Sequence, residues 1–331
     1  MIESIRFQNF KVLRDTQLPL QPFTVIVGPN GSGKTTALQA IQVLRAVPSL
    51  KRAISTGVPS DGSHPVNISF HWGGPNQGCV TEIRLLTATH KVQTVESSGV
   101  HVHKSALETV LRSTAVYALD AKAIAKPCRL YPNCALGEDG AGLAIILDQL
   151  RDRAPERFEL LNSELSRLIP EFDRILFVTP AEGTRSFELR QQTGSNAIPA
   201  TDLSQGTLIA LAILVLAHMP DPPPIVGLEE PDRGMHPRLL RDIRDALYRL
   251  SYPERYGETR KPVQVIATTH SPFFLDLFRD HPEEIVIANK VGQKAKFERL
   301  SDRPDINELL GDASLGDVWY SGILGGVPCE K

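Results

Sequence analysis

Eight residues near the start of the chain have the order expected of a polyphosphate-binding turn. The sequence GPNGSGKT occupies residues 28–35, after the apolar run 23–27 and before a helical pattern at 36–44. Glycines let successive backbone N–H groups converge on one point, and the following helix directs its positive dipole end there. We expect Lys34 to contact the β- and γ-phosphate oxygens and the Thr35 hydroxyl to hold Mg²⁺. The alternative is an ordinary glycine-rich strand-to-helix turn.

Two carboxylates end another apolar strand pattern far along the chain. The sequence PIVGLEEP at residues 224–231 places Glu229 and Glu230 at the strand's carboxyl end, before a proline. If this strand lies near the one that leads into the glycine turn, Glu229 would lie near Mg²⁺. Glu230 could then orient and deprotonate an attacking water. A solvated strand end would show the same pattern.

A histidine and a helix start supply two further candidates. His270 follows the apolar strand pattern at 261–269. Its imidazole could form a hydrogen bond with the γ-phosphate, or it could be purely structural. The sequence TDLSQGT at 201–207 opens a very apolar helix, with Asp202 or Ser204 as its N-cap. Free N–H groups there would attract an anion, which suggests a composite site completed by another copy of the chain. The alternative is simply a good helix cap.

The intervening segments alternate between strand and helix patterns. Two strands with a turn are expected within residues 2–27, and 66–72 with 80–85 form a hairpin pattern. The segment 55–64 is rich in Gly, Ser and Pro and is expected to be a loop, and no sustained heptads or repeats occur in the sequence. Further strands are expected at 91–95, 115–119, 174–178, 186–190, 284–288 and 294–298, and helices at 143–150, 156–169 and 306–310.

Composition excludes several classes of protein. The 331 residues suffice for one large or two modest domains, and 36 Lys+Arg against 38 Asp+Glu give no general basic excess for nucleic acid. The four cysteines lack C-x-x-C spacing and are expected to be reduced thiols in a cytoplasmic protein. His101 and His103 fit one face of a strand better than a metal site. The N-terminus has no secretory signal pattern, and the most apolar run, 208–217, is too short to span a membrane.

Taken together, these segments resemble the ABC-type ATPase heads of the SMC, RecF and OLD-like group. The chain closely resembles compact AAA-family members without a long coiled coil or a nuclease domain, and the resemblance covers nearly the whole chain. The segments that carry it are FQNFK at 7–11, the Walker A segment 28–35, the signature LSQGT at 203–207, the Walker B end Glu229-Glu230-Pro231, the D-loop 232–237 and the switch histidine His270.

The resemblance implies an α/β fold, a P-loop NTPase of ABC type. It implies a mixed central sheet with an antiparallel β subdomain and a helical subdomain. One domain would cover residues 1–331. Within it we expect a Walker A lobe at about 1–120, a helical insert at about 137–170 and a lobe at about 171–331 with the remaining motifs.

The resemblance also implies ATP and Mg²⁺ as cofactors and a role for each motif residue. Thr35 and Glu229 would hold the metal, Glu230 would be the catalytic base and His270 would read the γ-phosphate. Two heads would sandwich two ATP molecules as a homodimer. Implied ATP contacts are Asn30, Gly31, Ser32, Gly33, Lys34, Thr35 and Thr36, with Ser204 and Gly206 contacting the ATP of the opposite protomer.

Some features depart from the family pattern. Glu229 stands where many relatives have Asp, and the signature lacks the second glycine of transporters, which favours the OLD-like side of the group. A Q-loop glutamine is not identifiable, and Asp120 is the candidate for that position. Only about 60 residues follow His270, so we expect no appended nuclease domain and no DNA cleavage by this chain.

The expected function is an ATP-hydrolysing head that dimerises around ATP and drives or gates a partner in DNA repair or phage defence. The alternative is a nucleotide-gated scaffold with little turnover that controls a separate effector protein. DNA contact is compatible with the family but has no support from charge. A motor subunit of a membrane transporter is disfavoured, because no docking Q-loop is evident.

Overall fold

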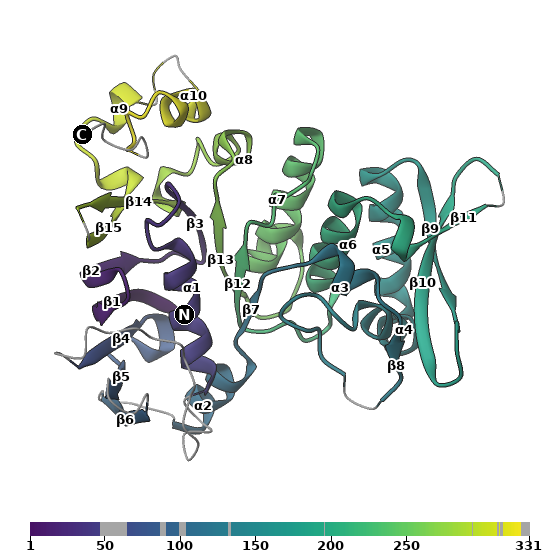
Figure 1. The fold of residues 1–331 in the computed structure, drawn as a ribbon, viewed down its shortest axis with the longest axis horizontal. Coiled ribbons are helices and arrows are strands. Elements are labelled where there is room, and N and C mark those ends of the chain that lie inside the picture. Colours follow the sequence, from purple (N-terminus) through teal and green to yellow (C-terminus); the bar gives the residue numbers. More distant parts are fainter. Residues whose placement is uncertain are drawn as a thin grey trace. The chain divides into compact units, whose positions relative to one another are not determined.

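A computed structural model describes most of the chain (Figure 1). The described residues are 1–46, 65–86, 91–98, 104–131, 134–194, 196–292, 294–309, 311 and 314–325. The expected loop at 55–64, the histidine pair 101 and 103, and Cys329 lie outside them. Cys79, Cys128 and Cys134 are free thiols.

The described chain forms two compact units. The sheet unit comprises Met1–Val116, Pro223–Glu229 and Thr259–Lys331, and the helical unit comprises Tyr117–Pro222 and Glu230–Glu258. The chain leaves the sheet unit after Val116 and returns to it at Pro223–Glu229 and again at Thr259–Lys331. The lobes expected at about 1–120, 137–170 and 171–331 stay a prediction.

A six-stranded mixed sheet forms the centre of the sheet unit. Its strand order is β15-β14-β3-β13-β12-β7. The strand β3 is parallel to its neighbours β13 and β14, β12 is parallel to β13, and β15 is antiparallel to β14. All five residues of β3 are buried, as expected for a strand in the interior of a parallel sheet. The bounds are β3 Phe23–Val27, β7 Ala115–Tyr117, β12 Ile225–Glu229, β13 Gln264–Thr269, β14 Ile285–Val291 and β15 Lys294–Arg299.

A second, antiparallel sheet of the same unit has the order β2-β1-β4-β5-β6. The expected hairpin is confirmed, because Val66 pairs with Leu85 and His71 with Val80. Residues 2–27 contain three strands rather than two, since a tight turn with positive φ at Asn9 and Lys11 joins β1 to β2. The bounds are β1 Ile2–Phe10, β2 Leu13–Pro19, β4 Val66–Trp72, β5 Val80–Leu86 and β6 Lys91–Ser98.

One hydrophobic core joins the two sheets through helix α1, Lys34–Ala46. It contains Phe7 and Phe70 from the antiparallel sheet, Ile41 from α1, and Ile26 and Ile266 from the central sheet. This core fixes the start of α1 against the end of β3. The other helices of the unit are α2 Lys104–Ser113, α8 Pro272–Asp276, α9 Ile306–Leu309 and α10 Leu315–Tyr320.

The helical unit is built around α6, Gln205–His218, in which every residue from Gly206 to His218 is buried. A helix that is apolar on all sides needs neighbours on all sides, and α3, α5 and α7 pack against it. No helix within the described residues is long and apolar enough to cross a bilayer. The other elements are α3 Ala121–Ala125, β8 Cys128–Arg129, α4 Leu143–Arg153, α5 Pro155–Leu168, β9 Phe172–Val178, β10 Thr184–Gln191, β11 Ala197–Pro199 and α7 Pro237–Ser251.

This architecture confirms the expected fold class, with its mixed central sheet, antiparallel β subdomain and helical subdomain. The strand expected at 115–119 ends at Tyr117.

Candidate nucleotide-binding site

The parallel register of the central sheet brings three predicted segments to one edge. Val27 pairs with Thr269 and Glu229 pairs with Thr268, so β3, β13 and β12 end side by side. The glycine turn follows Val27, and His270 follows Thr269. The carboxyl edge of such a sheet is where α/β proteins bind ligands.

The glycine turn has the backbone that its sequence predicts. Gly31 and Gly33 have φ of +76° and +99°, a region that residues with a side chain rarely adopt. A Cβ on Gly33 would lie 2.7 Å from Cδ2 of Leu13, and one on Gly28 would collide with the carbonyl oxygen of Ala288. The turn therefore requires glycine for both conformation and space.

Lys34 lies within this turn. Its Nζ donates to the carbonyl oxygens of Gly28 at 2.7 Å and Pro29 at 3.0 Å, and the residue is 6% exposed. The buried Ser32 hydroxyl has no hydrogen-bond partner among the described residues. A cation and an unpartnered hydroxyl inside a glycine turn at the start of α1 fit the binding of a phosphate chain.

Thr35 and Glu229 meet although 194 positions separate them in the chain. The Thr35 hydroxyl donates a hydrogen bond to Oε1 of Glu229. A hydroxyl and a carboxylate are the hard oxygen ligands that Mg²⁺ takes. The side chains expected to hold the metal are therefore in contact within the sheet unit, and the longer Glu side chain reaches the threonine.

Glu230 has an unusual backbone. Its φ is +45°, one of three non-glycine residues with positive φ among those described. Its carbonyl oxygen accepts from Arg233 N at 3.0 Å, which begins the turn that leads to α7. Such conformations cost of order 1–2 kcal/mol and are concentrated at functional sites. The role of Glu230 as catalytic base stays a prediction.

The signature segment and the D-loop contact each other in the helical unit. Ser204 is the N-cap of α6, and its Oγ accepts from Thr207 N at 3.1 Å. Gly206 is buried, and a Cβ on it would lie 2.5 Å from the carbonyl oxygen of Gly234. The sequence patterns predict both segments but not the contact between them, because the contact joins residues that are far apart in the chain.

Two remaining candidates have structural contacts of their own. Asp120 caps α3 by accepting from Ala123 N at 2.8 Å, so its place as a Q-loop equivalent stays a prediction. His270 is half-buried at the end of β13, just before Ser271, which caps α8.

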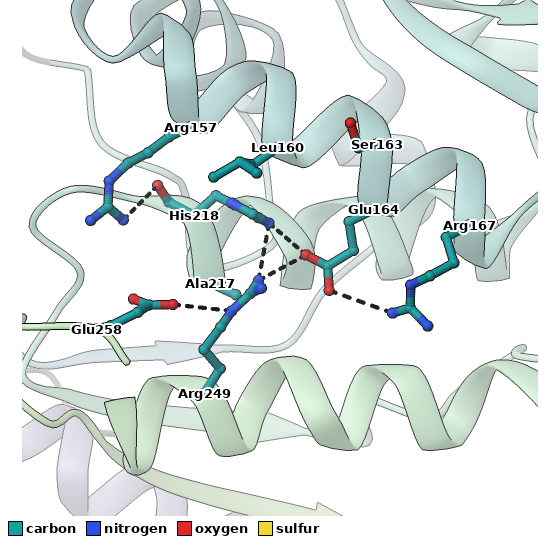
Figure 2. A pocket seen from close by; sticks show the side chains of 9 residues that line it. All are labelled: Arg157, Leu160, Ser163, Glu164, Arg167, Ala217, His218, Arg249 and Glu258. Atoms are coloured by element: carbon teal, nitrogen blue, oxygen red, sulfur yellow. Dashed lines mark hydrogen bonds and ion pairs between the residues drawn. The ribbon is translucent and has the colours of Figure 1, made fainter. Parts of the chain in front are cut away.

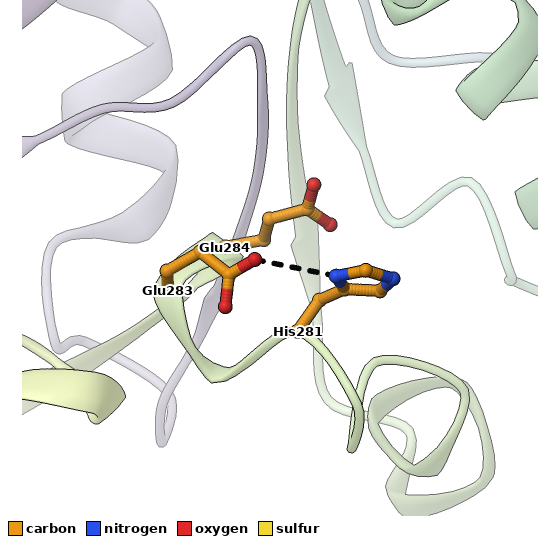
Figure 3. A group of neighbouring side chains, drawn as sticks. All are labelled: His281, Glu283 and Glu284. Atoms are coloured by element: carbon orange, nitrogen blue, oxygen red, sulfur yellow. Dashed lines mark hydrogen bonds and ion pairs between the residues drawn. The ribbon is translucent and has the colours of Figure 1, made fainter. Parts of the chain in front are cut away.

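A further group, His281, Glu283 and Glu284, precedes β14 (Figure 3). His281 Nδ1 lies 3.2 Å from Oε1 of Glu283, and Glu284 is buried. No sequence pattern described above indicates this group. A hydrogen bond explains the contact between His281 and Glu283, and no other observation among the described residues favours a metal ion there.

Comparisons with known proteins agree with this geometry. The model of the family "AAA ATPase domain" matches residues 1–52, and that of "AAA domain, putative AbiEii toxin, Type IV TA system" matches 119–276. An OLD nuclease of Thermus scotoductus (strain ATCC 700910 / SA-01) is 25% identical over 96% of this chain and 68% of that protein.

Solved SMC head domains share the fold. An SMC head bound to the C-winged helix domain of ScpA has a TM-score of 0.61 at 16% identity, covering 90% of this chain and 96% of that one. The chain has the fold of an ABC-type ATPase head and is similar to members of the SMC, RecF and OLD-like group. A second solved structure is an Smc head domain with a coiled coil and joint, derived from Pyrococcus yayanosii. It matches with a TM-score of 0.52 at 12% identity, covering 93% of this chain and 98% of the Smc chain.

Proposed function

We propose that this ABC-type head binds ATP together with Mg²⁺ and hydrolyses it. The observation that carries the proposal is the hydrogen bond between Thr35 and Glu229, which joins the glycine turn to the acidic strand end. Similarity to AAA ATPase domains and to an OLD nuclease supports the same activity.

Each residue of the glycine turn has a task in this proposal. Lys34 exchanges its bonds to the carbonyl oxygens of Gly28 and Pro29 for bonds to phosphate oxygens. The backbone N–H groups of residues 30–36 surround the phosphate chain. Thr35 and Glu229 hold Mg²⁺, which supplies positive charge to the phosphates.

The hydrolytic step needs a base and a group that holds the γ-phosphate. Glu230, which follows the last residue of β12, takes the proton of the attacking water. His270, at the same edge of the sheet as the glycine turn, donates to the γ-phosphate.

We further propose that two heads dimerise around ATP. Ser204 is exposed at the N-terminus of α6, where its hydroxyl and the free N–H groups of the first turn are suited to a phosphate of the opposite protomer. Gly206 supports this segment by its close approach to Gly234.

The ATP cycle would drive or gate a partner in DNA repair or phage defence. The similarity to an OLD nuclease supports the setting, and an SMC head seen with a winged-helix domain supports partner binding by heads of this fold.

The test is ATP-dependent phosphate release by the purified chain and its Glu230→Gln variant. Loss of the base should lower turnover by about 10²-fold or more while ATP binding persists. The exposed Glu171→Gln is the matched control and should keep full turnover. Unchanged turnover in Glu230→Gln would remove Glu230 from the mechanism. No phosphate release by the wild type would favour the nucleotide-gated scaffold.

A further inference from the structure

A cavity of about 490 Å³, lined by charged side chains and apolar surface, lies within the helical unit (Figure 2). None of its lining residues belongs to a segment assigned to ATP or Mg²⁺. Helix α5 forms one wall, and the last turns of α6 and α7 contribute the others. The lining residues are Arg157, Leu160, Ser163, Glu164, Arg167, Ala217, His218, Arg249 and Glu258.

The carboxylates of the cavity are already compensated by neighbouring side chains. Oε2 of Glu164 lies 2.6 Å from Nε2 of His218 and accepts from Nη2 of Arg249 at 2.8 Å. Burial raises the pKa of Glu164, but these hydrogen bonds and the Arg249 charge outweigh it and lower the pKa to about 2. Oε1 of Glu258 lies 3.5 Å from Nε of Arg249. Both carboxylates lie next to the guanidinium of Arg249, which reduces the negative charge that they bring to the cavity.

Among the arginines that line the cavity, Arg157 has the longest hydrogen bonds to other residues. Its Nη1 lies 3.5 Å from the carbonyl oxygen of His218 and 3.4 Å from that of Met219, both longer than an ordinary N–H···O bond. A guanidinium has five N–H donors in a planar fork that matches carboxylate and phosphate oxygens. Arg167, by contrast, is paired with Asp242 at 2.8 Å.

Figure 2 shows Arg157 reaching from α5 and Arg249 from α7 on opposite sides of the lining. Leu160, 60% exposed, and Ala217 add apolar surface between the charged groups. A volume of this size is within the range of small-molecule sites, which combine apolar walls with a few polar anchors.

We propose that this cavity, here called the α5–α6–α7 cavity, binds a small organic anion. The ligand carries a carboxylate or phosphate group, which Arg157 receives in place of its long contacts to the α6 carbonyls. An apolar portion of the ligand contacts Leu160.

Helices α6 and α7 connect the cavity to the signature segment and the D-loop. Helix α6 begins at the Ser204 cap and ends at His218, and α7 begins after the D-loop and carries Arg249 in its last turn. Their starts meet where Gly206 approaches Gly234, and their ends meet at the cavity. Each helix is about 20 Å long. An anion that takes Arg157 away from the carbonyl oxygens of His218 and Met219 removes a contact from the end of α6. Regulation of the ATP cycle through this helix rests on the proposed function.

The test of binding uses sodium phosphate and sodium succinate as probes on Lys34→Ala protein. This variant removes the cation of the glycine turn, so phosphate bound there does not contribute. Thermal unfolding and titration calorimetry are compared with sodium chloride at matched ionic strength. We expect a saturable rise in Tm with at least one probe, and the two probes distinguish a phosphate from a carboxylate ligand.

Two substitutions of Arg157 test whether this residue binds the probe. Arg157→Gln should raise the half-saturating concentration at least about tenfold, and Arg157→Lys by less, because it keeps the charge but loses the fork. The exposed Arg153→Gln at the end of α4 should change nothing. No saturable response to either probe, or an equal response with Arg157→Gln, would overturn the proposal.

Regulation is measured separately, by hydrogen exchange of residues 203–207 and 232–237 with and without the effective probe. Altered protection that Arg157→Gln abolishes supports the link between cavity and motifs. Binding without any change in protection refutes the link. Neither readout requires ATP hydrolysis, so failure of the proposed function is distinguishable from failure of this inference.

Discussion

Glu164 joins three helices of the helical unit, and its replacement by Gln should destabilise that unit in a pH-dependent way. The side chain is 13% exposed and bonds His218 on α6 and Arg249 on α7. A pKa lowered from 4.5 to about 2 corresponds to about 3 kcal/mol of stabilisation at neutral pH, and residual solvent reduces this to about 2 kcal/mol.

The sign of the pH dependence follows from the direction of this shift. Because the folded-state pKa lies below the ordinary value, the stabilisation is complete above about pH 4.5 and is lost as the pH falls towards 2. Urea unfolding of the wild type and Glu164→Gln should therefore differ by about 2 kcal/mol at pH 7, and the difference should shrink through that window.

The matched control is Glu159→Gln on the same helix. Glu159 is 58% exposed and pairs with Arg174 at 3.0 Å, so its loss should cost less than about 1 kcal/mol. Equal stability of wild type and Glu164→Gln at pH 7, or a difference independent of pH down to 3, would refute this reasoning.

Two further substitutions test other contacts. Gln264→Leu should lower the free energy of unfolding in chemical denaturation by about 3 kcal/mol, because the buried amide bonds both the N–H and the carbonyl of Ile2. The exposed Gln192→Leu is the control and should have little effect. Equal denaturation midpoints for the two variants would contradict this role of Gln264. Gly206→Ala should abolish ATP-dependent dimerisation, measured by sedimentation, while leaving ATP binding intact, because the added Cβ displaces Gly234. A dimer as stable as that of the wild type would show that the close approach of Gly206 to Gly234 is dispensable.

Much of the nucleotide-binding edge could be predicted because its signals are local. An apolar strand, a glycine turn and a helix start are adjacent in sequence around Lys34. Parallel strands end at a common edge, so the pattern ending in Glu229 was expected near Thr35, and the structure places them in contact.

The features that sequence missed depend on long-range packing or weak periodicity. Strand β2 exposes polar residues along one face and has only two buried positions, which gives little apolar signal. The group of Glu164, His218 and Arg249 is assembled from three helices, with partners 54 and 85 positions from Glu164. Because the three residues lie on different helices, no spacing within one element predicts this group.

The central claim is that the glycine turn and the acidic strand end hold one Mg²⁺-bound nucleotide. The most direct test is the binding of a non-hydrolysable ATP analogue, with and without Mg²⁺, to the wild type, Thr35→Ala, Glu229→Gln and the double variant. We predict that each single change removes at least about tenfold of the gain in affinity from Mg²⁺, and that the double variant loses little more than either. A Glu229→Gln protein that keeps the full gain from Mg²⁺, or single losses that simply add, would contradict the account.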